Sequence, residues 1–355
     1  MRMLSVPLTK VWTWIVAACL LAVFAFGCSG ESSSTESESG SSGASAGATA
    51  PSGPVGWTLL PQFPPREQVI SRRLLGVNDV QMVDANTAWV VGTDGAIGKT
   101  TDGGGAFTVQ KTGTAINLTG VWFVDTSNGW AVGTAGTVLR TSDGGANWEI
   151  LPSVQGVFAF ESVYFKDTQT GWAVADFGSI YRTSDAGNSW SKQDSGTSED
   201  LLDIAFLSDS SQAWAVGYNG AVVHSDDGGE TWATQDSGVD GVLYSVSFAS
   251  ASVGVAVGPK GLIVRTSDGG ATWSSVESGL TEDFFGVFFL NESEGWAVGA
   301  KSKIIHSTDG GMTWTEQETI TSGDSLNGVM FTSSNNGLSG GSGGRIWKFG
   351  PTPAQ

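Results

Sequence analysis

Short apolar runs alternate with clusters of Gly, Asn, Asp and Ser along most of the chain. A representative stretch has such runs at 120–124, 128–133, 136–140 and 148–151, rich in β-branched and aromatic residues. Runs of this length, bounded by turn-forming residues, predict four short β-strands. No stretch shows a convincing helical spacing of apolar residues over about ten residues or more. An all-β fold is therefore expected.

One turn recurs between the third and fourth runs. It reads Thr-Ser-Asp-Gly-Gly-Ala-Asn-Trp at 141–148, with close copies at 183–190, 225–232, 266–273 and 307–314 and a degenerate copy at 100–107. Its aspartates, spaced by 41 or 42 residues, are Asp102, Asp143, Asp185, Asp227, Asp268 and Asp309. Such a carboxylate can accept hydrogen bonds from the backbone N–H groups just beyond it, and the glycines allow positive φ. We expect these aspartates to be structural rather than calcium ligands.

The period and the number of units predict a seven-bladed β-propeller with four-stranded blades. A second-strand Trp marks five units, with Val255 and Leu338 in its place in the other two; the tryptophans are Trp89, Trp130, Trp172, Trp214 and Trp296. We expect them to pack between neighbouring sheets rather than to stack on sugars. The last unit, 326–349, lacks a fourth strand, whereas residues 56–61 resemble the fourth strand at 147–152. The N-terminal strand is expected to complete the last blade and close the ring.

The N-terminal region resembles a bacterial lipoprotein signal peptide. Arg2 and Lys10 are followed by an apolar run that ends in Gly27-Cys28. This predicts a signal peptide over 1–27, lipidation of Cys28, and a protein exported to the cell envelope. Ser29 resembles the sorting signal for the outer membrane, with either side of that membrane open. An uncleaved anchor or ordinary secretion is the alternative.

The remaining boundaries follow from composition. Residues 28–56 are rich in Ser and Gly without periodic apolar residues, which predicts a flexible linker. The propeller is expected over 57–350, with a tail at 351–355.

The chain from Cys28 onward is strongly acidic. It keeps 15 of the 17 Lys and Arg against all 35 Asp and Glu, because Arg2 and Lys10 lie in the signal. A charge of about −20 argues against nucleic acid and against an anionic membrane surface as partners. Cys28 is then the one cysteine, so neither a disulfide nor a Cys-bound metal is expected. We expect a monomer without a cofactor that binds a protein partner and is held to the membrane by its lipid.

A basic residue stands directly before the repeated turn in each unit, or at the same place in the last. These residues are Lys99, Arg140, Arg182, His224, Arg265, His306 and Lys348. An apolar residue lies two positions earlier, so the cations share a strand face with buried side chains. One interpretation is structural, with each stem laid over a ring of the neighbouring blade and each charge paired with a local acid. The other is a docking surface for a partner.

A second candidate site lies around the central channel. The connections between blades and the turns between second and third strands share one face of a propeller. Here they carry Arg66, Arg72 and Arg73, with Arg345 from the last unit nearby. The same face is expected to receive the acids Glu199, Asp200, Asp240, Glu282, Asp283 and Asp324.

The turn matches the Asp box, Ser/Thr-x-Asp-x-Gly-x-Thr-Trp. The whole repeat, Gly-Trp-Ala-Val-Gly and then Ile-x-Arg-Thr-x-Asp-Gly-Gly-x-x-Trp, resembles the photosystem II stability and assembly factor family over about 57–349. The resemblance implies a seven-bladed, non-enzymatic protein that binds a membrane-protein assembly intermediate. It also implies an arginine patch, at the positions of Arg140, Arg182 and Arg265, that holds the partner.

The Asp box also occurs in sialidases, which implies a glycan-binding or glycoside-hydrolase propeller as the alternative. In that family three arginines hold the substrate carboxylate, and a Tyr–Glu pair with an Asp carries out the reaction. The Phe/Tyr-Arg-Ile-Pro signature is missing, and none of the tyrosines lies in a recognisable nucleophile context; they are Tyr164, Tyr181, Tyr218 and Tyr244. No acid–base pair can be placed at a defined spacing, so no catalytic residue is assigned.

Overall fold

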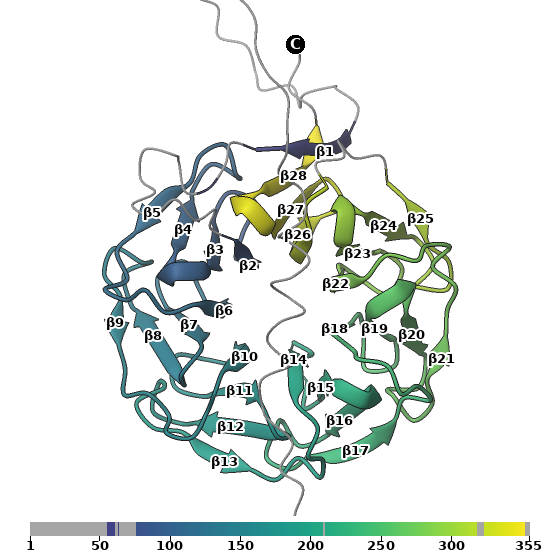
Figure 1. The fold of residues 1–355 in the computed structure, drawn as a ribbon, viewed down its shortest axis with the longest axis horizontal. Coiled ribbons are helices and arrows are strands. Elements are labelled where there is room, and N and C mark those ends of the chain that lie inside the picture. The colour runs from purple at the N-terminus through teal and green to yellow at the C-terminus, as the bar shows by residue number, and fades with distance from the viewer. Residues whose placement is uncertain (1–54, 61–62, 64–75, 209, 318–322, 352–355) are drawn as a thin grey trace, which may run out of the picture. The chain divides into compact units, whose positions relative to one another are not determined.

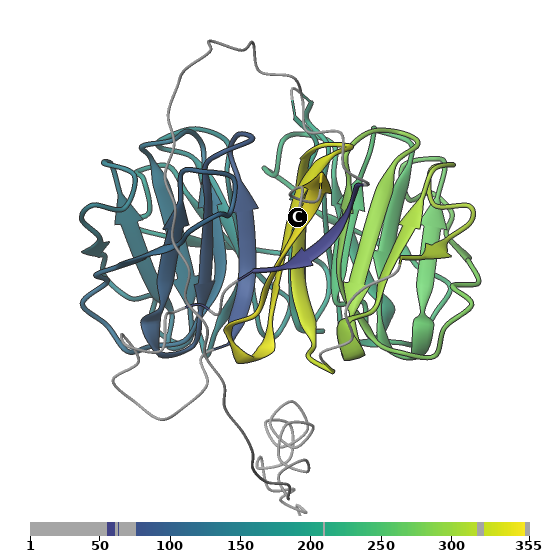
Figure 2. The same cartoon turned by 90° about the horizontal axis from the view of Figure 1, so that it is seen from above.

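The computed structural model describes residues 55–60, 63, 76–208, 210–317 and 323–351. Their strands form seven four-stranded antiparallel sheets, arranged as the blades of a ring (Figure 1). The first strand of each blade lies at the centre of the ring, and the strands run from one face of the ring to the other (Figure 2). The seven-bladed propeller expected from the sequence is confirmed. Cys28 and the predicted signal peptide lie outside the described residues.

The strands of the first four blades follow the chain in order. Blade 1 consists of β2 (Val77–Met82), β3 (Ala88–Gly92), β4 (Ile97–Thr100) and β5 (Thr108–Gln110). Blade 2 consists of β6 (Leu118–Phe123), β7 (Gly129–Gly133), β8 (Thr137–Thr141) and β9 (Glu149–Ile150). Blade 3 consists of β10 (Phe160–Phe165), β11 (Gly171–Ala175), β12 (Ser179–Thr183) and β13 (Ser191–Gln193). Blade 4 consists of β14 (Leu201–Phe206), β15 (Ala213–Gly217), β16 (Ala221–Ser225) and β17 (Ala233–Asp236).

The last blade takes its fourth strand from the N-terminal side of the chain. Blade 5 consists of β18 (Ser245–Phe248), β19 (Gly254–Val257), β20 (Ile263–Thr266) and β21 (Ser274–Ser275). Blade 6 consists of β22 (Phe284–Phe289), β23 (Gly295–Gly299), β24 (Ile304–Ser307) and β25 (Thr315–Glu316). Blade 7 consists of β26 (Leu326–Ser333), β27 (Asn336–Gly341), β28 (Ile346–Pro351) and β1 (Val55–Leu59).

The ring closes through β1, as the sequence predicted. This strand pairs antiparallel with β28, with Trp57 beside Phe349. The Trp57 side chain is buried and meets Phe331 of β26 edge to face, with 5.6 Å between ring centroids. The paired strand begins at Val55, two residues before the predicted start of the propeller. Closure of this kind covers an edge of β28 that would otherwise be unpaired.

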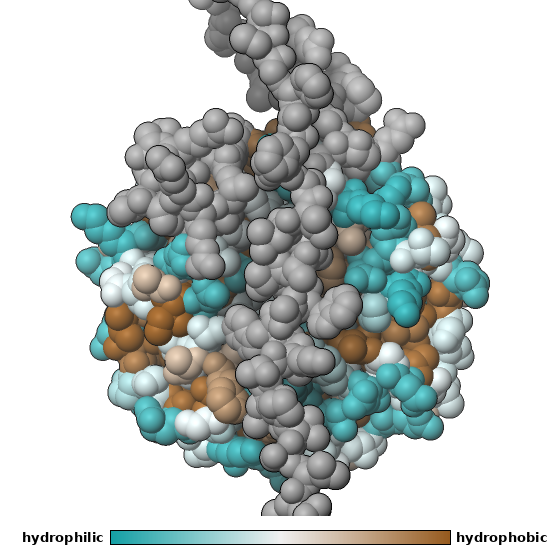
Figure 3. Space-filling model, viewed as in Figure 1, coloured by the Kyte–Doolittle hydropathy of each residue, from teal (hydrophilic) through white to brown (hydrophobic). Residues whose placement is uncertain are grey.

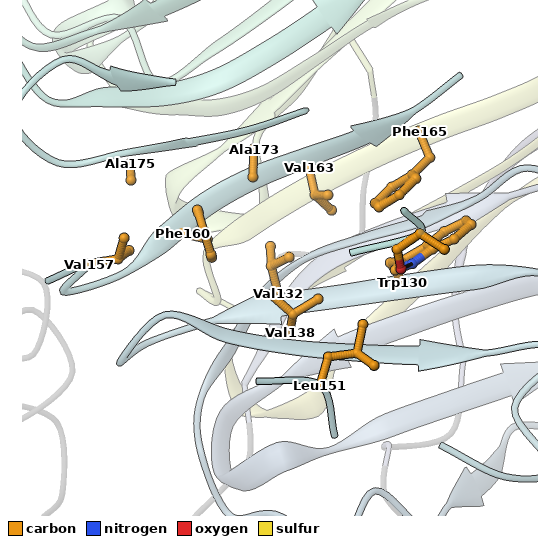
Figure 4. Close-up of a cluster of buried hydrophobic side chains, with 11 residues drawn as sticks. Trp130, Val132, Val138, Leu151, Val157, Phe160, Val163, Phe165, Ala173 and Ala175 are labelled. Atoms are coloured by element: carbon orange, nitrogen blue, oxygen red, sulfur yellow. Dashed lines mark hydrogen bonds between the residues drawn. The ribbon is translucent and has the colours of Figure 1, made fainter. Parts of the chain in front are cut away.

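Neighbouring blades pack through the second-strand tryptophans. Figure 4 shows Trp130 of β7 facing Phe165 of β10 within a cluster of aliphatic side chains. Stacked pairs of the same kind are Trp89 with Phe123, Trp214 with Phe248, and Trp296 with Phe331. The packing role predicted for these tryptophans is confirmed.

At the central channel, side chains of the first strands join one blade to the next. Asp79 of β2 accepts a hydrogen bond from the backbone N–H of Val121 in β6 over 2.9 Å. Asp203 of β14 accepts from the hydroxyls of Ser162 in β10 over 2.9 Å and Ser245 in β18 over 2.8 Å, so it links three blades. Burial raises the pKa of Asp79 to about 7. None of the helices in the described part of the chain has the length and apolar character needed to cross a bilayer.

Candidate functional site

The repeated turn is held by its own aspartate. The Thr141 hydroxyl and the backbone N–H of Asn147 both donate to Asp143 Oδ1, each over 2.9 Å. The Asn147 side-chain amide donates to Asp143 Oδ2 over 2.8 Å, and this hydrogen bond is the main cause of the lowered pKa of Asp143. Both carboxylate oxygens of Asp143 therefore accept hydrogen bonds from within the turn. In the described ranges, no group of three or more His, Cys, Asp or Glu is placed to hold a metal ion.

The turn also receives a side chain from the preceding blade. Trp172 Nε1 donates to the carbonyl of Gly229, in the turn of blade 4, over 2.9 Å. Gly229 has a φ of +80°, and a Cβ added there would lie 2.7 Å from that nitrogen, so the contact requires glycine. Blade 7 has no such turn to follow blade 6. Trp296 Nε1 of blade 6 is buried without a hydrogen-bond partner among the described residues, and so is Trp89 Nε1 of blade 1, although blade 2 has the turn.

Four of the basic residues before the turns, here called the cation row, lie over rings of their own blades, and these are Lys99, Arg182, His224 and His306. Lys99 Nζ is 4.8 Å from the ring centroid of Trp89, and Arg182 Cζ is 5.6 Å from that of Trp172. In both cases the two residues are register partners on the third and second strands of one sheet. The expectation that each stem covers a ring of the neighbouring blade was wrong. Directly opposite residues in one sheet are only about 5 Å apart, closer than the next blade.

The charged ends of several members of the row reach the next blade. The acceptors are carbonyls of the following turn, and the pairs are Lys99 Nζ with Gly144 O (3.0 Å) and Arg265 Nε with Gly310 O (2.6 Å). Lys348 of blade 7 likewise reaches blade 1, because its Nζ lies 3.3 Å from the place of a Cβ on Gly103. These cations therefore tie blades together.

Arg140 differs from the other two arginines of the row. It pairs with Glu149 on β9 of its own blade over 2.8 Å, and 28% of its side chain is exposed. Arg182 is similarly exposed but pairs with Glu230, in the turn of blade 4, over 2.6 Å. Of the three arginines, Arg140 is thus the one held within a single blade.

The turns between the second and third strands lie on the face of the ring opposite the repeated turns, here called the loop face. Five of them contain short 3-10 helices, which are η2 (Thr93–Gly95), η3 (Tyr218–Gly220), η4 (Pro259–Gly261), η5 (Ala300–Ser302) and η6 (Ser342–Gly344). They face the viewer in Figure 1. The register of blade 3 shows why the two sites separate: Ser162 of β10 and Ile180 of β12 lie toward the loop face, whereas Arg182 lies beyond them toward the repeated turn.

The acids expected on the loop face contact its turns. Asp200 accepts from the backbone N–H of Phe177 over 2.7 Å, and Asp283 accepts from that of Lys260 over 2.8 Å. Further contacts on this face join Glu199 to Asn219, Glu282 to Lys301 and Asp324 to Arg345. Asp240 stands next to Gly241, whose carbonyl accepts from the turn residue Gly220.

Of the four arginines expected to gather on this face, Arg345 is the one that lies among the described residues. Arg66, Arg72 and Arg73 lie outside the described residues. Arg345 follows η6, and its Nε lies 3.4 Å from Asp324 Oδ2. Arg345 is thus on the expected face, with an acid as its partner.

Glu161 is a carboxylate that sequence analysis missed. It stands near the start of β10, partly buried, and makes no hydrogen bond or ion pair among the described residues. Burial, and then the charges of Asp176 and Asp200, raise its pKa to about 7. Burial also raises the pKa of Tyr218, with the charges of Asp200 and Glu161 adding to the effect.

Two exposed phenylalanines on the loop face were also missed. Phe158 is 72% exposed and Phe177 is 60% exposed, and their rings meet edge to face with 6.1 Å between centroids. Figure 3 views this face and shows apolar surface over the part of the ring that holds β7–β12. Phe177 occupies a turn position that other blades fill with Asp94, Ala135, Asn219, Lys260, Lys301 and Gly343, all with positive φ. That comparison between repeats is the sequence signal that could have found it.

A closed ring of seven four-stranded sheets, with an aspartate-held turn in six of them, defines an Asp-box β-propeller. The match to a known family goes further. The profile described as "Photosynthesis system II assembly factor YCF48" matches residues 107–196, 188–277 and 232–328. The chain belongs to this family.

Solved structures share the fold at low sequence identity. "YCF48 bound to D1 peptide" is 20% identical with a TM-score of 0.68, over 84% of this chain and 95% of that one. "YCF48 from Cyanidioschyzon merolae" is 18% identical with a TM-score of 0.66, over 84% of this chain and 100% of that one. The WD40 β-propeller domain of Doa1 is 14% identical with a TM-score of 0.67, over 83% and 97% of the two chains. No curated protein matches the chain.

Proposed function

We propose that this chain is a non-enzymatic scaffold, exported and held at the cell envelope, that binds a protein partner. Membership of the assembly-factor family is the observation that carries the proposal. The solved "YCF48 bound to D1 peptide" supports it, since a propeller of similar fold holds a peptide there. The envelope location rests on the sequence around Cys28.

Binding has more support than glycoside hydrolysis. A sialidase-like site needs arginines beside its catalytic carboxylates. Here Arg345, the described arginine of the loop face, lies beside Asp324, and the charges that act on Glu161 are those of the acids Asp176 and Asp200. Burial raises the pKa of Tyr181 and Tyr244 as it does that of Tyr218, the opposite of what a tyrosine nucleophile needs.

Within the cation row, Arg140 is the member we propose for contact with the partner. Its guanidinium is partly exposed and bound within its own blade, so a partner can compete for it without separating two blades. Lys99, Arg182, Arg265 and Lys348 are engaged between blades.

The test is capture of the tagged full chain, cross-linked in membranes of its own cell, with an untagged strain as the control. We expect one membrane protein to be enriched, with cross-links that map to the propeller. Absence of any enriched protein, together with turnover of a sialoside or glucan that Glu161→Gln abolishes, would establish the alternative instead.

A further inference from the structure

The exposed pair Phe158 and Phe177, here called the Phe patch, includes a residue whose backbone conformation is strained. Phe177 has a φ of 55°, in the left-handed region that bulky side chains rarely adopt. The equivalent residue of blade 4 is Asn219, with a φ of 52°, and Asn tolerates this region well. Strained positions of this kind cluster where proteins contact ligands. The fold alone therefore gives no reason for a phenylalanine at this tip.

Neither ring is used by the core. Both remain mostly exposed, and their edge-to-face contact is with each other. An exposed apolar patch bordered by polar groups is typical of an interaction site. A pocket of about 410 Å³ adjoins Phe177 and is lined also by Gly178, Lys192, Gln193, Asp194, Ser195 and Thr197. If one side chain of a partner covers the two rings, a neighbouring side chain of that partner can enter this pocket.

Carboxylates hold the patch in place. Asp200 accepts from the backbone N–H of Phe177 over 2.7 Å, and Asp176 accepts from that of Phe158 over 3.2 Å. Glu161 lies near both acids, and their charges contribute to its raised pKa. None of these three carboxylates makes an ion pair among the described residues, so the border of the patch is negative. Lys192 is the cation at the pocket beside it.

We propose that the Phe patch is the docking site for a partner segment in which a basic residue is flanked by apolar residues. The apolar residues would cover the rings, and the basic residue would lie between the aromatic faces and the carboxylates, where both attract a cation. A formal charge of −18 on the chain disfavours a second copy of itself as the occupant. The inference rests on the proposed function, because it names the kind of segment that the scaffold holds.

The test measures binding of three matched synthetic peptides to the full chain by fluorescence anisotropy. One peptide alternates Arg with Leu, the second has Glu for Arg, and the third has Ser for Leu. We expect the Arg/Leu peptide to bind at least about tenfold more tightly than either of the others, and Phe177→Asn with Phe158→Ser to remove that advantage. The double variant Asp176→Asn with Asp200→Asn keeps an acceptor oxygen at each position and removes both charges. It should weaken binding of the two Arg-containing peptides and leave the Glu peptide without such a loss.

Two controls separate the patch from general effects. Lys260→Asn changes the same turn position in blade 5, and Met312→Ser removes an exposed apolar side chain from the turn of blade 6. Neither should change binding. Equal binding of the Arg and Glu peptides, binding that survives the double Phe variant, or self-association abolished by that variant would overturn the proposal. If the double Phe variant still captures a membrane protein, the Phe patch is wrong and the proposed function stands. If the unchanged chain captures no protein at all, the proposed function itself is wrong.

Discussion

The indole ring of Trp130 lies flat against the phenyl ring of Phe165 across the boundary between blades 2 and 3. Their centroids are 3.7 Å apart and their planes differ by 6°. Trp130 Nε1 also donates to the carbonyl of Ala186, in the turn of blade 3, over 2.9 Å. One side chain therefore joins the two blades by both packing and a hydrogen bond.

Replacing this side chain should be costly. Trp130→Ala should lower the free energy of unfolding by about 3–5 kcal/mol, because it opens a cavity and removes the donor to Ala186. Urea denaturation measures the loss. Ile150→Ala, at an exposed position on β9, should change stability by less than about 0.5 kcal/mol. Similar losses in the two variants would contradict the packing role.

Removing β1 should open the ring. A chain that starts after Ser52 should melt like the longer one, whereas a chain that starts after Pro61 should melt several degrees lower or more, because it exposes an edge of β28 and loses Trp57. Differential scanning calorimetry of the two truncations is the measurement. Equal melting temperatures would refute closure by this strand.

The three arginines of the cation row should respond unequally to charge reversal. Arg265→Glu removes the hydrogen bond to Gly310 between blades and should cost about 1–3 kcal/mol of unfolding free energy. Arg140→Glu breaks a partly exposed pair with Glu149 and should cost less than about 1 kcal/mol. Thermal denaturation compares the two.

Partner capture then separates the two interpretations of the row. Loss of capture in Arg140→Glu, with stability unchanged, supports the docking role implied by the family resemblance. If that variant still captures the partner, the role of Arg140 is structural.

Glu161 should make stability depend on pH. Its pKa is about 7 in the fold, above the ordinary 4.5, so between these values the folded chain binds a proton that the unfolded chain does not. Its contribution is fully present below pH 4.5 and is lost as pH rises through 7. Glu161→Gln should remove this contribution, which amounts to at most about 3 kcal/mol, and should leave the loss due to Asp79, whose pKa is also about 7. Denaturation across this pH range tests it, with Glu149→Gln as an exposed control.

The anchor is tested by changing Cys28. If the predicted signal is correct, Cys28→Ser should move the protein from the membrane fraction to the soluble fraction, because the site of lipidation is lost. Fractionation and mass spectrometry of the N-terminal peptide check this. Unchanged fractionation and an unlipidated peptide starting at residue 28 would refute the tether.

The sequence predicted the fold because the same physical constraint recurs in each unit. Asp143 and its copies mark one turn in each of six blades. The second-strand tryptophans, with Val255 and Leu338 in their place in two units, mark one position in every blade, so counting them counts the blades. The site was harder to predict. The Lys99 side chain lies over Trp89 of its own blade, and its Nζ donates to Gly144 of the next blade. The spacing of the repeats does not specify which blade such a side chain contacts. Phe158 and Phe177 come from different connections, and the distance between their rings is set by tertiary structure.

The pairing of β1 with β28 also sets an order in time. A ribosome makes Trp57 early and Phe349 about 290 residues later, which takes roughly 15–60 s at usual rates of protein synthesis. Until then Trp57 has no strand to pair with, and the seventh sheet cannot form. A nascent or interrupted chain thus presents an open edge and an uncovered indole to chaperones and proteases, and completion of synthesis removes both.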